Sequence, residues 1–413
     1  MLRSMTIPPH IADALAMVNI ELRAKNLAAT AEPLFDGPQI ITLLCRTAFG
    51  VDPKRIKALS DALAMRTGAD ACAIQQSGLG LIIQLPKAKE HRRKLLPAHL
   101  ERIISRERRR KPRSAVPVGL DAEGRAVWVD LADSRSPHLI AVGLTGSGKS
   151  NLLLWMAYRL ASQNRAEHLQ LLAISPKAAD VEWFSRLPHL LHPPVSSTFE
   201  ASRVMAWLMS EVERRNAHMV TRPALVVLLD EAPHLIEADP AIGDGLNRIA
   251  QIGRSLGVHL LIGSQRADQK TIGGLIYNMP ARAIGRVGSS QFSWVTSGRS
   301  NSEADQLLGN GDLLLSSADG LTRFQAPLMV NREWGRLERA AFQRELDLPH
   351  PVEFTATATA SNATPLEDDQ LLAIAERFQE GASIRSVMRD WKIGYDRAKQ
   401  IQEIVLEEVS IEQ

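Results

Sequence analysis

The sequence is poor in cysteine and in long apolar runs. Its only cysteines are Cys45 and Cys72, and neither belongs to a CxxC pair or stands near a histidine at ligand spacing. This pattern excludes a disulfide scaffold and a zinc site, and it predicts two small buried thiols in a reducing compartment. No apolar stretch approaches the ~20 residues of a membrane-spanning helix, and the N-terminal residues lack the apolar segment of a signal peptide. We therefore expect a cytoplasmic protein without membrane insertion.

The chain also lacks a strong excess of charge of either sign. Its 49 Lys and Arg residues oppose 46 Asp and Glu residues, which leaves a net charge of +3. The total charge therefore says little about partners, but one segment is strongly basic. Between His91 and Arg113, ten Lys or Arg residues accompany only two acids. Such a segment either attracts phosphate backbones or forms a solvated, partly helical connector.

The length of 413 residues suggests two or three domains. Residues 1–32 predict a helical arm, because Ile11, Leu15, Val18 and Leu22 fall on one face of a helix, and the pattern assigns no function to it. Residues 33–113 predict a small α+β domain that ends in the basic connector. Its expected elements are a strand at 39–45, a helix at 53–66, and strands at 71–75 and 79–85.

From residue 114 onward, strand-like apolar runs alternate with helical stretches. The runs cover residues 139–143, 169–174, 225–229, 258–263 and 281–287. Buried runs separated by helices are typical of a parallel sheet that is covered on both faces. We therefore predict an α/β fold with a mostly parallel central sheet at residues 114–349. Residues 354–365 are small and uncharged, so we expect a flexible linker at 350–365 before a helical domain at 366–413.

Residues 143–150, GLTGSGKS, match the eight-residue P-loop pattern in full. The motif follows an apolar run and opens a helical pattern at 151–160, which is the context that it requires. Its glycines allow backbone N–H groups to surround phosphate oxygens, and the helix N-terminus adds a favourable dipole. We therefore predict a RecA-like P-loop NTPase motor that uses ATP and Mg²⁺, with Lys149 on the β- and γ-phosphates and Ser150 on the metal. The predicted nucleotide-binding residues are Gly143, Leu144, Thr145, Gly146, Ser147, Gly148, Lys149, Ser150 and Asn151.

Two adjacent acids end another apolar run, LVVLLDE at residues 225–231. Acids at the carboxyl end of a strand lie beside the P-loop in this architecture. We therefore predict that Asp230 holds the Mg²⁺ ion, directly or through water. Glu231 is the candidate that orients and deprotonates the attacking water.

Two further polar residues have open interpretations from spacing alone. Gln265 follows the run at 258–263, where it would either sense the γ-phosphate or cap a loop as a buried amide. Arg254 ends a helical pattern at 246–256, just before Gly257. It would either stabilise charge in a transition state or serve as the favourable cation at a helix C-terminus.

Together with these motifs, longer segments resemble the FtsK/SpoIIIE DNA translocases from about Gly37 to the end of the chain. The segments are SPHLIAVGLTGSGKS (136–150), LLAISPKAADVEWFSRLPHLL (171–191), LVVLLDEAPHLI (225–236), GRSLGVHLLIGSQRADQKTIGGLIYNMPARAIGRVGSS (253–290) and LLGNGDLLL (307–315). Residues 37–69 look like the small domain that precedes the motor in that family. Ser175 departs from the family pattern, which usually has Asp at this position.

The resemblance implies a homohexameric ring around double-stranded DNA, with ATP bound between subunits. It implies that Arg254 reaches the phosphate in the neighbouring subunit. Such an arginine finger, supplied by another subunit, raises the rate of hydrolysis by ~10³–10⁵-fold in other NTPases. It also favours Gln265 as a sensor in the motor. Lys and Arg on loops in the pore would push the phosphate backbone without reading sequence, and Arg266 and Lys270 are our candidates for that contact.

The C-terminal residues 366–413 show three helical patterns that are separated by Gly381 and Gly394. The short break at 392–395 suits a helix-turn-helix, although a three-helix protein-interaction module fits the pattern equally well. The resemblance favours the helix-turn-helix, which reads DNA in that family. The predicted DNA contacts are Arg397 and Lys399 to phosphates, Gln400 to a base, and Glu403 as a further exposed candidate.

The resulting prediction is an ATP-dependent translocase of double-stranded DNA. One alternative is a conjugative-coupling or viral DNA-packaging ATPase, which would need a portal. Another alternative is a DNA-binding switch that assembles with ATP and does not translocate. The adjacent Asp230 and Glu231 argue against a switch, since a switch has less need of a water-activating acid.

Overall fold

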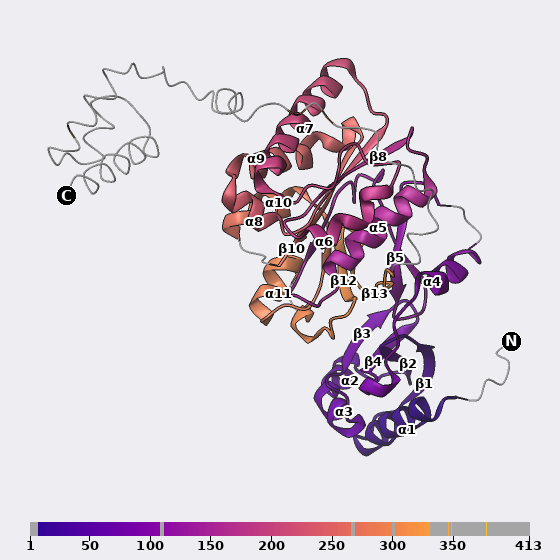
Figure 1. The fold of residues 1–413 in the computed structure, drawn as a ribbon. Helices are drawn as coiled ribbons and strands as arrows, with labels where there is room; N and C mark the ends of the chain where they lie inside the picture. The colour runs from indigo at the N-terminus through magenta and orange to yellow at the C-terminus, as the bar shows by residue number, and fades with distance from the viewer. Residues whose placement is uncertain are drawn as a thin grey trace. The chain divides into compact units, whose positions relative to one another are not determined.

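The computed structural model describes residues 7–107, 111–265, 269–299 and 302–330, together with residues 346, 348 and 377 (Figure 1). Residues 1–350 form one compact unit, and residues 351–413 form a second unit. The expected linker and, apart from residue 377, the expected helix-turn-helix lie outside the described residues.

Helix α1 (Pro9–Ala24) begins at the predicted Pro8-Pro9 pair, because proline at the first helical position lacks only an N–H that the helix does not use. Ile11, Val18 and Leu22 are buried, as the spacing predicted. The helix packs on strand β1 (Ala29–Asp36), where the Asn19 amide bonds both the N–H and the C=O of Ala31. Strand β1 crosses the predicted boundary between the helical arm (1–32) and the small domain (33–113). The two predicted parts also pack into one apolar core.

The small sheet has the order β1-β2-β4-β3 with antiparallel neighbours. Its other strands are β2 (Ile40–Thr47), β3 (Ala73–Ser77) and β4 (Gly80–Pro86). The single helix expected at 53–66 is two helices, α2 (Pro53–Lys57) and α3 (Ser60–Thr67). We refer to residues 9–86, which build this sheet and its helices, as the small module. Two short elements follow it, η1 (Lys89–His91) and α4 (Pro97–Ile104), within the basic segment.

The motor is built on a nine-stranded sheet of order β6-β5-β13-β12-β11-β7-β10-β9-β8 among the described residues. Its strands are β5 (Ala115–Asp121), β6 (Ala126–Asp130), β7 (Leu139–Val142), β8 (Leu169–Ile174), β9 (Ala224–Leu229), β10 (Val258–Ser264), β11 (Ala281–Ile284), β12 (Asp312–Ser317) and β13 (Gly320–Gln325). The five apolar runs are the strands β7 to β11, and these pair in parallel. The remaining strands β5, β6, β12 and β13 add an antiparallel half that the sequence did not predict. The sheet is therefore mixed, and "mostly parallel" describes only the half that carries the P-loop.

Helices cover both faces of the motor sheet (Figure 1). They are α5 (Lys149–Gln163), α6 (Ala178–Val181), η2 (Glu182–Arg186), α7 (Thr198–His218), α8 (Ala232–Ala238), α9 (Pro240–Ile252), η3 (Gly253–Leu256), α10 (Gln269–Asn278), α11 (Ser290–Ser297) and η4 (Ala304–Gln306). Successive residues of β7 point to opposite faces, with Leu139 in the core beneath α5 and Ile140 in the core beneath α7 and α9. Within the described residues, no helix combines the length and the apolar character that crossing a bilayer requires.

The role of α1 as part of the small module's core can be tested with Leu22→Ala. Leu22 is fully buried, so the truncation should lower the free energy of unfolding by about 2–5 kcal/mol. Met17→Ala on the same helix is the control, because Met17 is 38% exposed and its truncation should change stability little. Urea unfolding of both variants provides the measurement, and equal effects would contradict the shared core.

Candidate active site

The P-loop connects β7 to α5 and is attached at its start to two neighbouring strands of the sheet. The Gly143 N–H donates to Ser264 O at 3.2 Å, and the Leu144 N–H donates to Arg286 O at 2.8 Å. Gly146 and Gly148 have φ values of +80° and +105°, which side chains rarely tolerate, so glycine is needed at both positions. Helix α5 begins directly after the loop at Lys149, so its unpaired N–H groups face the loop.

Lys149 is buried, and its ammonium donates to Leu144 O at 3.2 Å. Burial lowers the pKa of this ammonium, against the opposing effect of the Glu231 and Asp230 carboxylates. The charged form therefore lacks solvation, and a phosphate chain in the loop would supply the missing counter-charge. This is the environment in which an anion binds favourably.

Asp230 follows β9 and is also buried. Its Oδ1 accepts the Glu231 N–H at 3.0 Å, and its carboxylate also accepts a hydrogen bond from the Ser150 side chain. Burial raises the pKa of the Asp230 carboxyl, and the Ser150 hydrogen bond opposes this rise. A Cβ at Gly263 would lie only 1.9 Å from Asp230 Oδ1, so this glycine on β10 makes the space that the carboxylate occupies.

Ser150 and Asp230 offer what Mg²⁺ requires, a hydroxyl and a carboxylate oxygen that already adjoin each other. Among the described residues, no group of three His, Cys, Asp or Glu side chains converges on a metal-sized site. A magnesium ion that is held by one carboxylate, one hydroxyl and phosphate oxygens needs no such group. The two predicted ligands therefore fit a nucleotide-bound magnesium ion, which would neutralise phosphate charge there.

Glu231, Gln265 and Thr145 form a connected polar chain above the loop. The Gln265 Nε2 donates to Glu231 Oε1, and the Gln265 Oε1 accepts from Thr145 Oγ1 at 2.9 Å. Glu231 also accepts from Lys177 Nζ at 3.2 Å. The structure thus places Gln265 between the P-loop and the candidate water-activating acid.

A cavity of about 310 Å³ brings Thr145, Lys149, Ser150, Glu231 and Gln265 together, whereas Asp230 is not among its lining residues. It is lined by Lys94, Leu95, Thr145, Gly146, Gly148, Lys149, Ser150, Asn151, Lys177, Glu231, Gln265, Asn310, Gly311, Gln325, Ala326 and Leu328. Asn151 has a structural partner as well, because its side chain donates to Pro327 O at 2.7 Å and accepts the Met329 N–H at 2.8 Å. The cavity therefore combines the predicted phosphate end with a second, more apolar end near Leu95 and Leu328.

Sequence reasoning did not assign three parts of this cavity. The first is Lys177, which follows Ser175 in the segment where the family usually has Asp. The second is the connector at Lys94 and Leu95, where only the basic charge had been noted. The third is the loop around Asn310, whose LLGNGDLLL segment had been noted only for its resemblance to the family.

Residues 99–222 match the profile of the FtsK/SpoIIIE family. These residues carry the FtsK/SpoIIIE family signature. The DNA translocase FtsK of Caldanaerobacter subterraneus subsp. tengcongensis is 28% identical over 412 residues, which cover 92% of this chain and 56% of the relative. The chain thus spans about half the length of the curated relatives that it matches first.

Solved structures with the same fold include members of secretion and conjugation systems. The cytoplasmic domain of the Thermomonospora curvata type VII secretion ATPase EccC matches 58% of this chain and 32% of its own length, with 28% identity and a TM-score of 0.51. The pCW3 conjugation coupling protein TcpA matches 78% of this chain and 96% of its own length, with 19% identity and a TM-score of 0.52. The resemblance to the FtsK/SpoIIIE family and the α/β class of the motor are thus confirmed.

Among the remaining residues predicted from the FtsK/SpoIIIE resemblance, Arg254 is the one that the structure describes with its side chain, and it does not line the cavity. Arg254 lies exposed on η3, and the pKa of nearby Asp133 is about 2, mainly through hydrogen bonds from Arg135 and in smaller part through Arg254. Arg266 lies outside the described residues, and Lys270 is placed only as a backbone position on α10. The tail residues Arg397, Lys399, Gln400 and Glu403 also lie outside the described residues.

The burial of Asp230 predicts a conflict between stability and metal binding. The folded-state pKa of Asp230 is raised, so above that pKa the ionised carboxylate opposes folding. Asp230→Asn should therefore raise the melting temperature of the nucleotide-free protein at neutral pH and abolish the Mg²⁺-dependent stabilisation by ATP. Asp244→Asn, on the exposed side of α9, is the control that should change neither value. A lower melting temperature for Asp230→Asn would contradict the burial argument.

Proposed function

We propose that this chain is an ATP-dependent translocase of double-stranded DNA that acts as a homohexameric ring. The observation that carries the proposal is the convergence of Lys149, Ser150 and Glu231 on one cavity, with Asp230 hydrogen-bonded to Ser150, together with a family profile whose named relatives include DNA translocases. Lys149 and the P-loop would bind the triphosphate, and Ser150 and Asp230 would hold Mg²⁺. Hydrolysis at this site would drive movement along the duplex, which passes through the ring.

Glu231 is the proposed general base. Its carboxylate lies at the end of a buried strand next to Asp230, and Lys177 and Gln265 hold it in place over the cavity. A base must lie within hydrogen-bond reach of the water that attacks the γ-phosphate, and the position of this carboxylate in the lining of the P-loop cavity supports that role. Gln265 connects the same carboxylate to Thr145, which supports its role as a sensor of the γ-phosphate.

Arg254 is the proposed finger that acts on the neighbouring subunit. It is exposed and absent from the lining of its own chain's cavity, so it is available to another protomer. The motor would then be complete only where two subunits meet. DNA contacts by Arg266, Lys270 and the C-terminal helices, and a cytoplasmic location, belong to the same proposal.

The proposed chemistry can be tested with Glu231→Gln in a triplex-displacement assay. Wild-type protein should displace a third strand from linear duplex DNA with ATP, whereas Glu231→Gln should bind ATP and lose turnover and displacement by about 10²–10⁴-fold. Glu237→Gln is the control on the following helix α8. Normal hydrolysis by Glu231→Gln would show that another group is the base. A wild-type protein that hydrolyses ATP with DNA and displaces nothing would indicate a switch.

The trans role of Arg254 can be tested by mixing two inactive variants. Arg254→Ala and Lys149→Ala should each lose ATP turnover by about 10³-fold or more. In a mixed ring, an intact P-loop from the first variant would face an intact Arg254 from the second, so the mixture should regain part of the activity. A mixture that never exceeds the sum of the separate variants would contradict a finger shared between subunits.

A further inference from the structure

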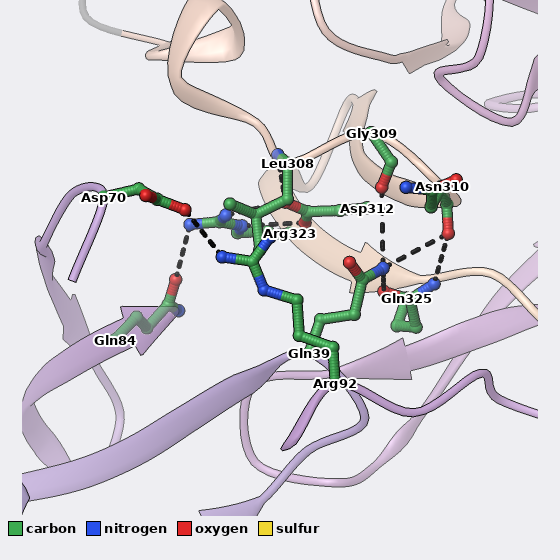
Figure 2. Close-up of polar contacts among 10 residues, drawn as sticks. All are labelled: Gln39, Asp70, Gln84, Arg92, Leu308, Gly309, Asn310, Asp312, Arg323 and Gln325. Carbon is green, nitrogen blue, oxygen red and sulfur yellow. Dashed lines mark hydrogen bonds and ion pairs between the residues drawn. The ribbon is translucent and has the colours of Figure 1, made fainter. Parts of the chain in front are cut away.

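The small module and the motor have largely separate apolar cores, although Phe35 of β1 packs against the motor's core. The module's core is formed by residues between Ile11 and Leu85, and the core beneath α5 by residues from Leu95 onward. Polar side chains meet where the two parts touch: Gln39 and Gln84 from the module, and Asp312, Arg323 and Gln325 from the motor (Figure 2). A cavity of about 30 Å³ lies along this contact, which is room for about one water molecule. A polar contact of this kind allows two parts to move against each other more readily than a shared apolar core does.

Gln39 makes the most direct connection across this contact. Its side chain is only 6% exposed, and its Nε2 donates to Gln325 Oε1 at 2.6 Å and to Asn310 O at 3.2 Å. Gln325 donates to the same Asn310 carbonyl at 3.0 Å, as Figure 2 shows. One carbonyl of the motor is therefore held by two amides, one from each part of the protein.

The loop that carries this carbonyl lies directly against the P-loop. The Asn310 N–H donates to Gly146 O at 2.9 Å, and the Gly311 N–H donates to Ser147 O at 2.9 Å. The packing is tight, because a Cβ at Gly148 would lie 2.6 Å from Gly311 N. Asn310 and Gly311 also line the nucleotide cavity. A displacement of this loop would therefore displace the phosphate-binding backbone.

The base of the same loop is fixed by a buried ion pair. Arg323 Nη2 and Asp312 Oδ2 are 2.7 Å apart, and the same oxygen accepts the Leu308 N–H at 2.9 Å. Burial acts to lower the pKa of Arg323, but the Asp312 carboxylate outweighs that effect and the pKa is raised. Arg323 also donates to Gln84 Oε1 of the module at 3.3 Å. The loop is thus rigid at its base, and Gln39 acts at its tip.

From these contacts we infer that Gln39 is a positioning residue for nucleotide binding, through which the small module sets the geometry of the P-loop. The order of contacts is Gln39 to the Asn310 carbonyl, then the Asn310 and Gly311 N–H groups to the Gly146 and Ser147 carbonyls. When the module is docked, the loop holds the P-loop in its binding shape. By thermodynamic reciprocity, bound ATP favours the docked module. This inference deepens the proposed ATPase function and rests on it.

The test measures binding of a fluorescent ATP analogue with Mg²⁺ to the full chain. Gln39→Ala should raise the Kd about threefold to tenfold, the range expected for a lost hydrogen bond. Thr42→Val is the matched control, because Thr42 lies buried along the same contact, and among the described residues its hydroxyl has no hydrogen-bond partner. Its Kd should stay within about twofold of wild type.

A double-mutant cycle distinguishes positioning from general loosening of the fold. In a Gln325→Ala background, Gln39→Ala should raise the Kd by less than in wild type, because Gln39 has already lost its acceptor Gln325 Oε1 and the two amides hold the Asn310 carbonyl together. Gln39→Met keeps the length of the side chain and adds no charge but cannot donate, so it should raise the Kd like Gln39→Ala. It replaces Gln39→Ala if that variant fails to fold. ATP should also raise the melting temperature of both Gln39 variants less than that of wild type.

An unchanged Kd for Gln39→Ala, or fully additive effects in the cycle, would overturn the inference. This outcome is separate from failure of the proposed translocation. A wild-type chain that binds the analogue but displaces no triplex would contradict translocation, while a Kd that rises with Gln39→Ala would still support the positioning role.

Discussion

The candidate site depends on one constraint, which is that a carboxylate must remain charged at a buried position beside the P-loop. Asp230 meets this constraint because Gly263 on the next strand leaves space for it, and because Ser150 and the Glu231 N–H donate to it. The arrangement is unfavourable for the empty protein and becomes favourable when a cation is present. Lys149 carries the opposite charge under the same condition: its ammonium is buried, so an anion beside it would stabilise its charged form. The folded chain thus carries two opposite charges whose environment suits Mg²⁺ and a phosphate chain.

The sequence predicted well those strands whose residues form continuous apolar runs between polar segments. The five parallel strands are uniformly buried, so they appear as apolar runs, and their carboxyl ends were enough to place Asp230 beside the P-loop. The antiparallel strands β5, β6, β12 and β13 escaped prediction. Strands β6 and β13 have partly exposed faces, and β5 contains Pro117 and Gly119, so their patterns are weak. Strand β1 was missed for a similar reason, because Pro33 accompanies an irregular register with β2.

The site residues likewise divide into those that the sequence predicted and those that it did not. Motifs that are contiguous in sequence, such as residues 143–151 and the pair Asp230 and Glu231, were found because their chemistry is local. Lys177, the connector at Lys94 and the loop at Asn310 reach the cavity only through the folding of distant segments. No spacing rule connects Gln39 to Asn310, which lies 271 positions away. Contacts of this kind are set by packing of the two parts, and a single sequence carries no signal for them.

Asn151 has a consequence for how force would travel through the molecule. Both ends of its amide are occupied by the backbone that follows β13, at Pro327 and Met329. Farther along the chain, the Leu348 carbonyl accepts from Arg203 of α7 at 2.7 Å, and Leu348 is buried in the core beneath α7 and α9. Asn151 belongs to the first turn of α5, directly after the P-loop residues. Tension on the C-terminal residues would therefore meet the attachment at Leu348 before it reached Asn151 and the P-loop.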